Sequence, residues 1–150
     1  MATHSDNSAQ SRADLGALVL RLTLGTMFIA HALLKIFVFT LPGTAKFFES
    51  LGLPGPLAYV VFWAELIGGV LILAGVHSRW VAAALIPILL GAAWAHAGNG
   101  WVFSAPNGGW EYPVFLAAAA GVQALLGDGR YALGNALFAR KLQPTLSPSY

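Results

Sequence analysis

Five ionisable side chains lie in or at the ends of strongly apolar segments, where they could do chemistry. They are His31, Lys35, Glu65, His96 and Glu111. His31 and Lys35 are four residues apart in the stretch FIAHALLKIF, so a helix places them on one face. An ionised group near the centre of a bilayer costs on the order of 3 kcal/mol. Helix packing alone does not need five such groups, so they are candidates for a functional site.

The favoured partners are Lys35 and Glu65, because both are expected at a similar depth in the membrane and carry opposite charges. His31 and His96 could extend the pair into a hydrogen-bonded network, and Glu111 could meet His96 or Lys35 at the mouth of the site. The sequence thus predicts a polar pocket that binds a polar head group or passes protons. The alternatives are a purely structural salt bridge, a Lys35 that snorkels outward and a His96 in wet surroundings at the interface.

Other classes of chemistry find little support. Two histidines and two carboxylates could in principle hold a metal, but no helical H-x-x-x-H or E-x-x-H spacing is present and Lys35 would repel a cation. We therefore predict no metal site. The chain has no cysteine, which excludes disulfides and thiol chemistry within it. No Ser-His-Asp arrangement, phosphate-binding glycine loop or dinucleotide fingerprint is present.

The composition indicates that lipid is the main solvent of this chain. The 150 residues are 57% hydrophobic and only 9% charged, whereas soluble domains average about 25% charged residues. The eight basic residues are scattered rather than clustered, so no nucleic-acid partner is expected.

Four apolar stretches, each near the roughly 20 residues that cross a bilayer, must position these side chains. They are Ala17–Leu41, Leu57–Val76, Trp80–Ala97 and Tyr112–Leu126. The predicted fold is all-α, a four-transmembrane-helix bundle with a kink at Pro87. Small residues four apart are expected to let the helices approach closely. These pairs are Ala64 and Gly68, Gly91 and Ala95, and Ala117 and Gly121.

Two connections are predicted to lie at the membrane–water interface on the outer side of the bundle. Thr44–Leu53 carries its aromatic and aliphatic residues on one face, which predicts a short interfacial helix after the first span. Gly98–Trp110 is nearly uncharged, and Trp101, Asn107 and Trp110 are candidates for the rim of the pocket. An aromatic belt with no further role is the alternative for this loop.

The basic residues set the expected orientation. Six of them fall on one side of a four-span bundle, which predicts both termini in the cytoplasm and the four spans in the plasma (inner) membrane. Arg21 is expected to snorkel to that side. We predict a mobile N-terminal segment over residues 1–16, a membrane domain over 17–133 and a cytoplasmic tail over 134–150. The first apolar run is too long for a signal peptide.

Several segments together resemble the DoxX family of small four-helix membrane proteins. They are RLTLGTMFIAHALLK, FFESLGLPGPLAYVVFWAELIGGVLILAGVHSRW, NGGWEY and GDGRYAL. The resemblance runs from about Leu18 to Leu133. The family usually has Gly where Ala32 stands, and often an acidic residue where Gly134-Asn135 stands, so no role transfers to that last point. The resemblance implies association with a quinone-linked oxidase or another redox enzyme. Members thought to act through thiols are excluded as guides because this chain has no cysteine.

Three functions compete. The first is a quinone-interacting subunit whose polar cluster bonds quinone carbonyls and relays protons, with a redox enzyme subunit as the source of electrons. The second is a non-catalytic anchoring subunit. The third is a small proton-coupled transporter, which would need a homo-oligomer because the chain shows no internal repeat. No catalytic motif is present in this chain alone, and quinone is the one cofactor that the resemblance suggests.

Overall fold

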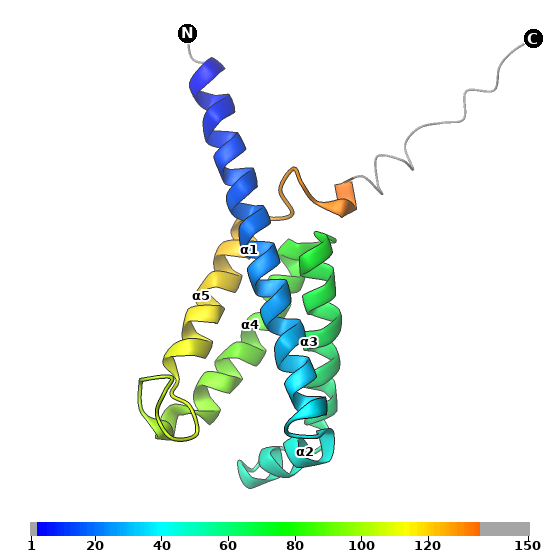
Figure 1. Cartoon of the computed structure of the whole chain (residues 1–150), viewed down its shortest axis with the longest axis vertical. Helices are drawn as coiled ribbons and strands as arrows, with labels where there is room; N and C mark the ends of the chain where they lie inside the picture. Colours follow the sequence, from blue (N-terminus) through cyan, green and yellow to red (C-terminus); the bar gives the residue numbers. More distant parts are fainter. Residues whose placement is uncertain (1–2, 136–150) are drawn as a thin grey trace, which may run out of the picture.

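The structure is a computed structural model that describes residues 3–135, with side chains from residue 7 onward. It is all-α, as predicted, and the described residues form no strand. Figure 1 shows the helices as one bundle. The elements are α1 (Thr3–Phe37), α2 (Leu41–Ser50), α3 (Leu57–Ala74), α4 (Ser78–Ala95), the short 3-10 helix η1 (Ala97–Asn99) and α5 (Glu111–Leu126).

Three helices are long and apolar enough to cross a membrane: residues 7–37 of α1, and the whole of α3 and α4. The expected bounds of the last three spans agree with α3, α4 and α5 to within two residues. However, α5 has 16 residues, which is about 24 Å of helix against a hydrocarbon core of about 30 Å. The fourth span therefore stays a prediction, whereas the helical bundle is confirmed.

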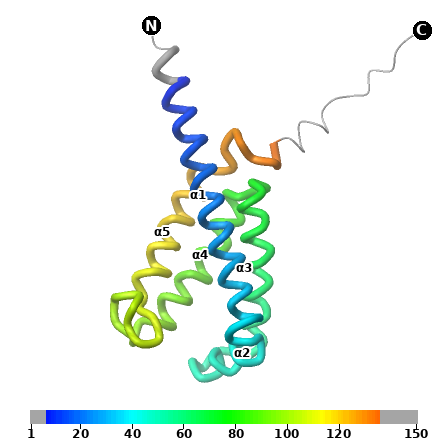
Figure 2. The backbone as a smooth tube through the Cα atoms, viewed as in Figure 1, coloured from blue at the N-terminus to red at the C-terminus, as the bar shows by residue number. Residues whose placement is uncertain are grey.

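The first helix differs from its expected bounds at both ends. It begins at Thr3, so residues 3–16, expected as a mobile segment, are the first turns of α1 (Figure 2). It ends at Phe37 rather than Leu41. Pro42 does not terminate it but lies in the first turn of α2, where a missing N–H costs nothing. The Thr40 side chain caps α2 by accepting a hydrogen bond from the Gly43 N–H at 3.1 Å.

The short helix after the first span is present, three residues earlier than Thr44–Leu53, as α2. It crosses one end of the bundle in Figure 2. We call this the outer end, which also carries the 98–110 loop, and we call the opposite end, which carries residues 127–135, the inner end.

The closest helix crossing joins α1 to α3 at two glycines. A Cβ on Gly25 would lie 2.8 Å from the Gly69 carbonyl oxygen, and one on Gly69 would lie 3.0 Å from the Gly25 carbonyl oxygen. Among the expected small residues, Gly68 faces Leu85, but no atom lies within 4 Å of a Cβ built on Gly91 or Gly121. The small-residue contact that brings two backbones together was therefore not among the predicted pairs.

The core lies between two helix pairs, α1 with α3 and α4 with α5. Its buried side chains come from all four helices: Leu24, Phe28, Ile72, Ala82, Leu85, Leu89, Leu116, Ala117 and Ala120. The pairs meet toward the inner end and diverge toward α2 (Figure 1). Large apolar side chains such as Leu125, 80% exposed, cover the outside of the bundle. A surface of this kind suits lipid rather than water.

A polar network closes the inner end. Arg21 is only 1% exposed and donates to the carbonyl oxygens of Leu73 at 3.5 Å and Tyr131 at 3.2 Å. The prediction that Arg21 snorkels is therefore wrong, because the turn after α5 folds back and supplies acceptors inside the protein. The backbone N–H and hydroxyl of Ser78 both donate to Asp128. The side-chain amide of Gln123, which is fully buried, donates a hydrogen bond to the Ser78 hydroxyl oxygen at 3.2 Å.

Candidate functional site

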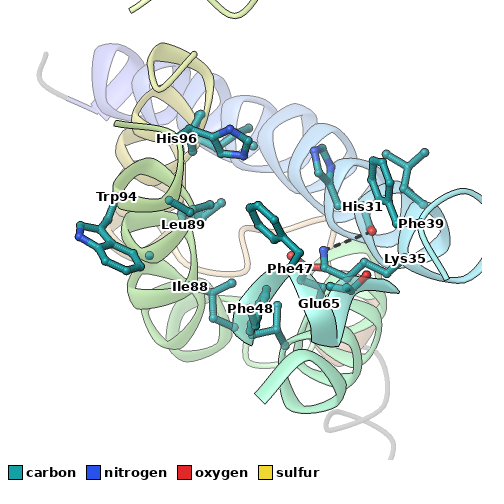
Figure 3. Close-up of a pocket in the computed structure, with 18 of the residues that line it drawn as sticks. His31, Lys35, Phe39, Phe47, Phe48, Glu65, Ile88, Leu89, Trp94 and His96 are labelled. Atoms are coloured by element: carbon teal, nitrogen blue, oxygen red, sulfur yellow. Dashed lines mark hydrogen bonds and ion pairs between the residues drawn. The ribbon is translucent and has the colours of Figure 1, made fainter. Parts of the chain in front are cut away.

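The divergence of the helix pairs leaves a cavity of about 960 Å³ in the outer half of the bundle. Leu, Ile, Phe, Pro and other apolar side chains form most of its wall. Figure 3 shows this cavity with most of its lining side chains. The polar side chains on the wall are His31, Lys35, Thr44, Glu65, His96, Asn107 and Tyr112.

Lys35 and Glu65 form the predicted ion pair. Lys35 Nζ lies 2.6 Å from Glu65 Oε2, and the side chains are 14% and 9% exposed. The pair joins α1 to α3, and Figure 3 shows Lys35 and Glu65 next to each other on one side of the cavity. Lys35 Nζ also donates to the His31 carbonyl oxygen at 3.4 Å. Two opposite charges at a similar depth in lipid form an ion pair because each would be costly to bury in the membrane without a partner.

His31 lies one helical turn deeper than Lys35 and borders the same cavity. Its Nδ1 is 2.8 Å from the Met27 carbonyl oxygen on the same helix. The ring stacks on Tyr112 of α5, with centroids 5.8 Å apart and planes inclined by 22°. The Tyr112 hydroxyl is buried and has no partner within residues 3–135. Tyr112 was missed from sequence because nothing in its spacing relates α5 to α1.

His96 stands on the wall formed by the end of α4. Its Nδ1 lies 3.0 Å from the carbonyl oxygen of Asn107 and 3.2 Å from that of Gly108. Asn99 Nδ2 donates to the same two carbonyls. The expected side-chain network through both histidines is therefore not formed in the described part of the chain, since each histidine bonds to backbone carbonyls instead.

Glu111 does not join the site. The prediction that it meets His96 or Lys35 is wrong, because its Oε1 accepts a hydrogen bond from the Phe103 N–H at 2.8 Å. The 98–110 loop wraps over the start of α5, and its backbone forms a hydrogen bond with this carboxylate. Of the expected rim residues, only Asn107 borders the cavity. Trp101 and Trp110 pack edge to face on each other, with ring centroids 4.4 Å apart.

The cavity reaches the lipid-facing surface of the bundle. Phe47 and Phe48 of α2 contribute to its wall beside the ion pair (Figure 3). Phe39 and Trp94 line the cavity and are also 60% and 56% exposed. Side chains that are both lining and exposed mark where a cavity meets the outside.

The polar side chains on the wall suit an organic ligand better than a metal ion. Among the described residues, no three His, Cys, Asp or Glu side chains lie close enough together to hold a metal ion. Glu65 is already bonded to an ammonium group. The wall encloses a large apolar volume and carries a few polar groups, which is the usual composition of a small-molecule site.

Comparison with known proteins shows which family the chain belongs to. The DoxX family model matches residues 16–98, more than half of the sequence. The chain belongs to the DoxX family. The matched residues run from α1 to the end of α4 and carry His31, Lys35, Glu65 and His96, whereas Tyr112 and Glu111 lie beyond them.

One curated relative has a name that states a chemical class. The chain is 42% identical over 79 residues to a Bacillus subtilis protein called "Putative oxidoreductase CatD". The match spans 53% of this chain and 58% of that relative, so it covers little more than half of either protein. No solved structure matches the chain.

Proposed function

We propose that this DoxX-family membrane protein binds a quinone in its outer cavity and works as the membrane subunit of a redox enzyme. The observation that carries the proposal is the cavity itself: about 960 Å³, mostly apolar, with an ion pair and two histidines on its wall. Ligand sites of this kind usually measure about 300–1,000 Å³. A quinone has a polar ring for the polar groups and an apolar tail for the rest.

The route of entry supports the same ligand class. Quinones dissolve in the bilayer, and Phe39 and Trp94 mark a wall of the cavity that faces the bilayer. A water-soluble substrate would need a polar mouth instead. The name of the Bacillus relative, an oxidoreductase, agrees with a redox setting. Nothing in the described residues is an electron carrier, so the electrons would come from a partner enzyme.

The proposed topology has four spans in the plasma (inner) membrane and both termini in the cytoplasm. The start of α1 and residues 127–135 lie at the same end of the bundle (Figure 1), and the Arg130 N–H donates to Asp14 at 3.1 Å. An even number of crossings gives this arrangement. The excess of basic residues on that side favours the cytoplasm.

The first experiment measures quinone in the purified protein. The protein is extracted in native lipid particles, and its lipophilic content is compared with that of empty particles from the same membranes. We expect near-stoichiometric quinone in the wild type and a loss in Glu65→Gln, which keeps the shape of the side chain but removes its charge. Quinone at the level of the empty particles would overturn the proposal.

Glu111→Gln is the matched control, because Glu111 is an outer-end carboxylate that does not border the cavity. It should keep the wild-type quinone content. Equal losses in both variants would show that quinone retention depends on general stability and would contradict a site at Glu65.

An anchoring subunit is the second candidate, and the short Lys35–Glu65 contact is the observation that favours it. The pair ties α1 to α3 at 2.6 Å and could serve structure alone. In that case a redox partner would co-purify with Lys35→Met/Glu65→Met as well as with the wild type, and quinone would stay at the control level in both.

A further inference from the structure

Thr40, the residue that joins α1 to α2, has a strained backbone. Its φ is 61° and its ψ is 150°, a combination that is found almost only at glycine. A β-branched side chain makes this conformation a genuine outlier. His77, by contrast, has the ordinary left-handed values of 50° and 33°, and Asn107 is of a type that tolerates positive φ. Strain of this kind collects at ligand clamps and switch regions, so the segment that Thr40 connects is a candidate for such a role.

The hydrogen bonds of Thr40 all run to α2. Its side-chain oxygen accepts from the Gly43 N–H at 3.1 Å, and its carbonyl oxygen accepts from the N–H and the hydroxyl of Thr44, each at 2.9 Å. The last bond at the end of α1 forms at Phe39, whose N–H donates to the Leu34 carbonyl oxygen at 2.9 Å. Within residues 3–135, no hydrogen bond joins α1 to α2. The cap therefore belongs to α2 and moves with it.

Apolar packing attaches α2 to the rest of the bundle. Among the described residues, every hydrogen bond of the segment 40–53 stays inside that segment, and the segment forms no ion pair. Thr44 is the buried residue of α2. The segment ends in a turn in which Gly52 has a φ of 79°, and Pro54 follows. A short helix that lies between two such joints and has no polar tie to its neighbours can move as one body.

One face of α2 forms the cavity wall beside the polar groups. Phe47 and Phe48 line the cavity, and Figure 3 shows them close to Lys35 and Glu65. Phe47 is 45% exposed, so its ring is not packed into a core. A ligand whose head group reaches the ion pair lies against these two rings. Displacing α2 therefore opens the cavity at its polar groups.

Resting on the quinone site proposed above, we propose that α2 is a lid that swings about Thr40 to admit and release the quinone. In the closed position, which the structure shows, Phe47 and Phe48 cover the polar groups of the cavity and Thr40 holds the strained conformation. Opening lets Thr40 relax to an ordinary negative φ. The strain thus raises the population of the open lid, whereas the contacts of the two rings with the cavity and its ligand favour the closed lid.

A disulfide that pins the lid tests this motion, and the chain offers a suitable position for it. A sulfur at the position of Glu49 Cγ would lie 3.4 Å from a Cβ built on Gly55, so Glu49→Cys/Gly55→Cys needs only a small shift to form the bond. Neither residue lines the cavity, and the natural chain has no cysteine that could compete. The disulfide joins the far end of α2 to the turn before α3.

The measurement is the rate at which bound quinone leaves the protein. Protein loaded with a fully substituted decyl benzoquinone is diluted into quinone-free detergent micelles, and recovery of tryptophan fluorescence follows release, since Trp94 lines the cavity. The crosslinked protein, loaded before oxidation, is compared with the same variant reduced, methylated at both thiols and freed of reductant. We expect the crosslink to slow release at least about tenfold.

Gly68→Cys/Leu85→Cys is the matched control. A sulfur at the position of Leu85 Cγ would also lie 3.4 Å from a Cβ built on Gly68, and this crosslink joins α3 to α4 at residues that do not line the cavity. It should leave the release rate unchanged. Equal release with and without the crosslink between residues 49 and 55 would overturn the lid and leave the quinone site standing. Folded wild-type protein that takes up no quinone would overturn the proposed function as well, so the two failures are distinguishable.

Thr40→Gly and Thr40→Ala separate the strain from the cap. Both remove the side-chain oxygen that accepts from the Gly43 N–H, but alanine keeps a Cβ in the strained conformation, whereas glycine adopts it freely. We expect Thr40→Gly to release quinone severalfold more slowly than Thr40→Ala, because its closed lid is free of strain, an effect larger than the extra freedom that glycine gains in the open lid. Equal rates, or faster release from Thr40→Gly, would overturn the role of Thr40 as the strained hinge.

Discussion

The inner and outer ends of this bundle use similar polar residues in opposite ways. At the inner end, Arg21 and Gln123 are at most 1% exposed and bond to carbonyls and side chains of the protein itself. At the outer end, His31 and His96 each use one ring nitrogen and leave the other facing a cavity. Most polar atoms of the inner end bond within the protein, although Arg21 Nε and Gln123 Oε1 have no partner among the described residues, whereas those of the outer end also border a cavity.

The difference arises from how the chain closes each end. The turn after α5 folds back at the inner end, so that Asp128 reaches Ser78 and the Tyr131 carbonyl reaches Arg21. At the outer end α2 lies across the opening, but it contributes phenylalanines and no charged partner to the wall. The helix pairs diverge there, and the space between them is not filled by side chains.

The largest expected effect comes from placing one bulky residue in each region. A Cβ on Gly68 would lie 2.8 Å from Leu85 Cδ1, so Gly68→Leu overpacks the core and should cost about 3 kcal/mol of stability, the upper end of the usual range for overpacking. Gly91 borders the cavity, and no atom lies within 4 Å of its Cβ position. Gly91→Leu should therefore fold normally but occupy the cavity and lower the quinone content.

Detergent unfolding followed by circular dichroism gives the stabilities, and the quinone assay gives the occupancies. Gly91→Ala serves as the control, because a single methyl group leaves most of the cavity open. If Gly91→Leu unfolded as readily as Gly68→Leu, the outer half would be packed and the contrast between the two ends would fail.

The inner-end network gives the next largest effect. Arg21→Met removes the donors to the Leu73 and Tyr131 carbonyls and the electrostatic attraction between Arg21 and Asp128. A hydrogen bond from a charged group contributes about 1.5–3 kcal/mol, and the bond to Leu73 is long at 3.5 Å and so contributes little. We therefore expect a loss of about 2–3 kcal/mol in the free energy of unfolding, mainly from the bond to Tyr131. Once folded, the variant should keep the wild-type quinone content.

Arg12→Met is the comparison for Arg21, since Arg12 is exposed on the same helix and has no such partners to lose. Its stability should stay within about 0.5 kcal/mol of the wild type. An Arg21→Met protein as stable as Arg12→Met would mean that the inner network does not hold the bundle.

Much of this fold follows from sequence, because lipid makes simple demands on a helix. Three apolar stretches predict α3, α4 and α5 to within two residues. The Lys35–Glu65 pair also follows, since two opposite charges at one depth in lipid have few other partners. Local composition and depth were sufficient for both inferences.

The remaining features depend on contacts between distant segments. The Gly25–Gly69 crossing requires knowing that α1 packs on α3. Arg21 is buried because of a turn more than 100 residues later in the chain. Glu111 is drawn to Phe103 by the path of the 98–110 loop, and the stacking of Tyr112 on His31 depends on how α5 meets α1. Residue types alone do not specify these pairings.

The smallest expected effect separates the two roles of the ion pair. Lys35→Met leaves Glu65 as a lone carboxylate, which should cost about 2 kcal/mol, less than in a fully packed site because this side chain borders a cavity and is 9% exposed. Lys35→Met/Glu65→Met removes both charges and should recover most of that stability. Detergent unfolding of the wild type, the two single variants and the double variant measures the coupling between the two side chains.

The quinone assay on the same four proteins then decides what the pair is for. A double variant that is stable but contains no quinone would show that the ion pair is needed for binding. The Glu65 carboxylate would then be lost while the contact between the helices remains. A double variant that is stable and still holds quinone would assign the pair to structure, and His31 and His96 would be left as the polar end of the site. In either case the outer end would differ from the inner end, where removing a charge is expected to change stability alone.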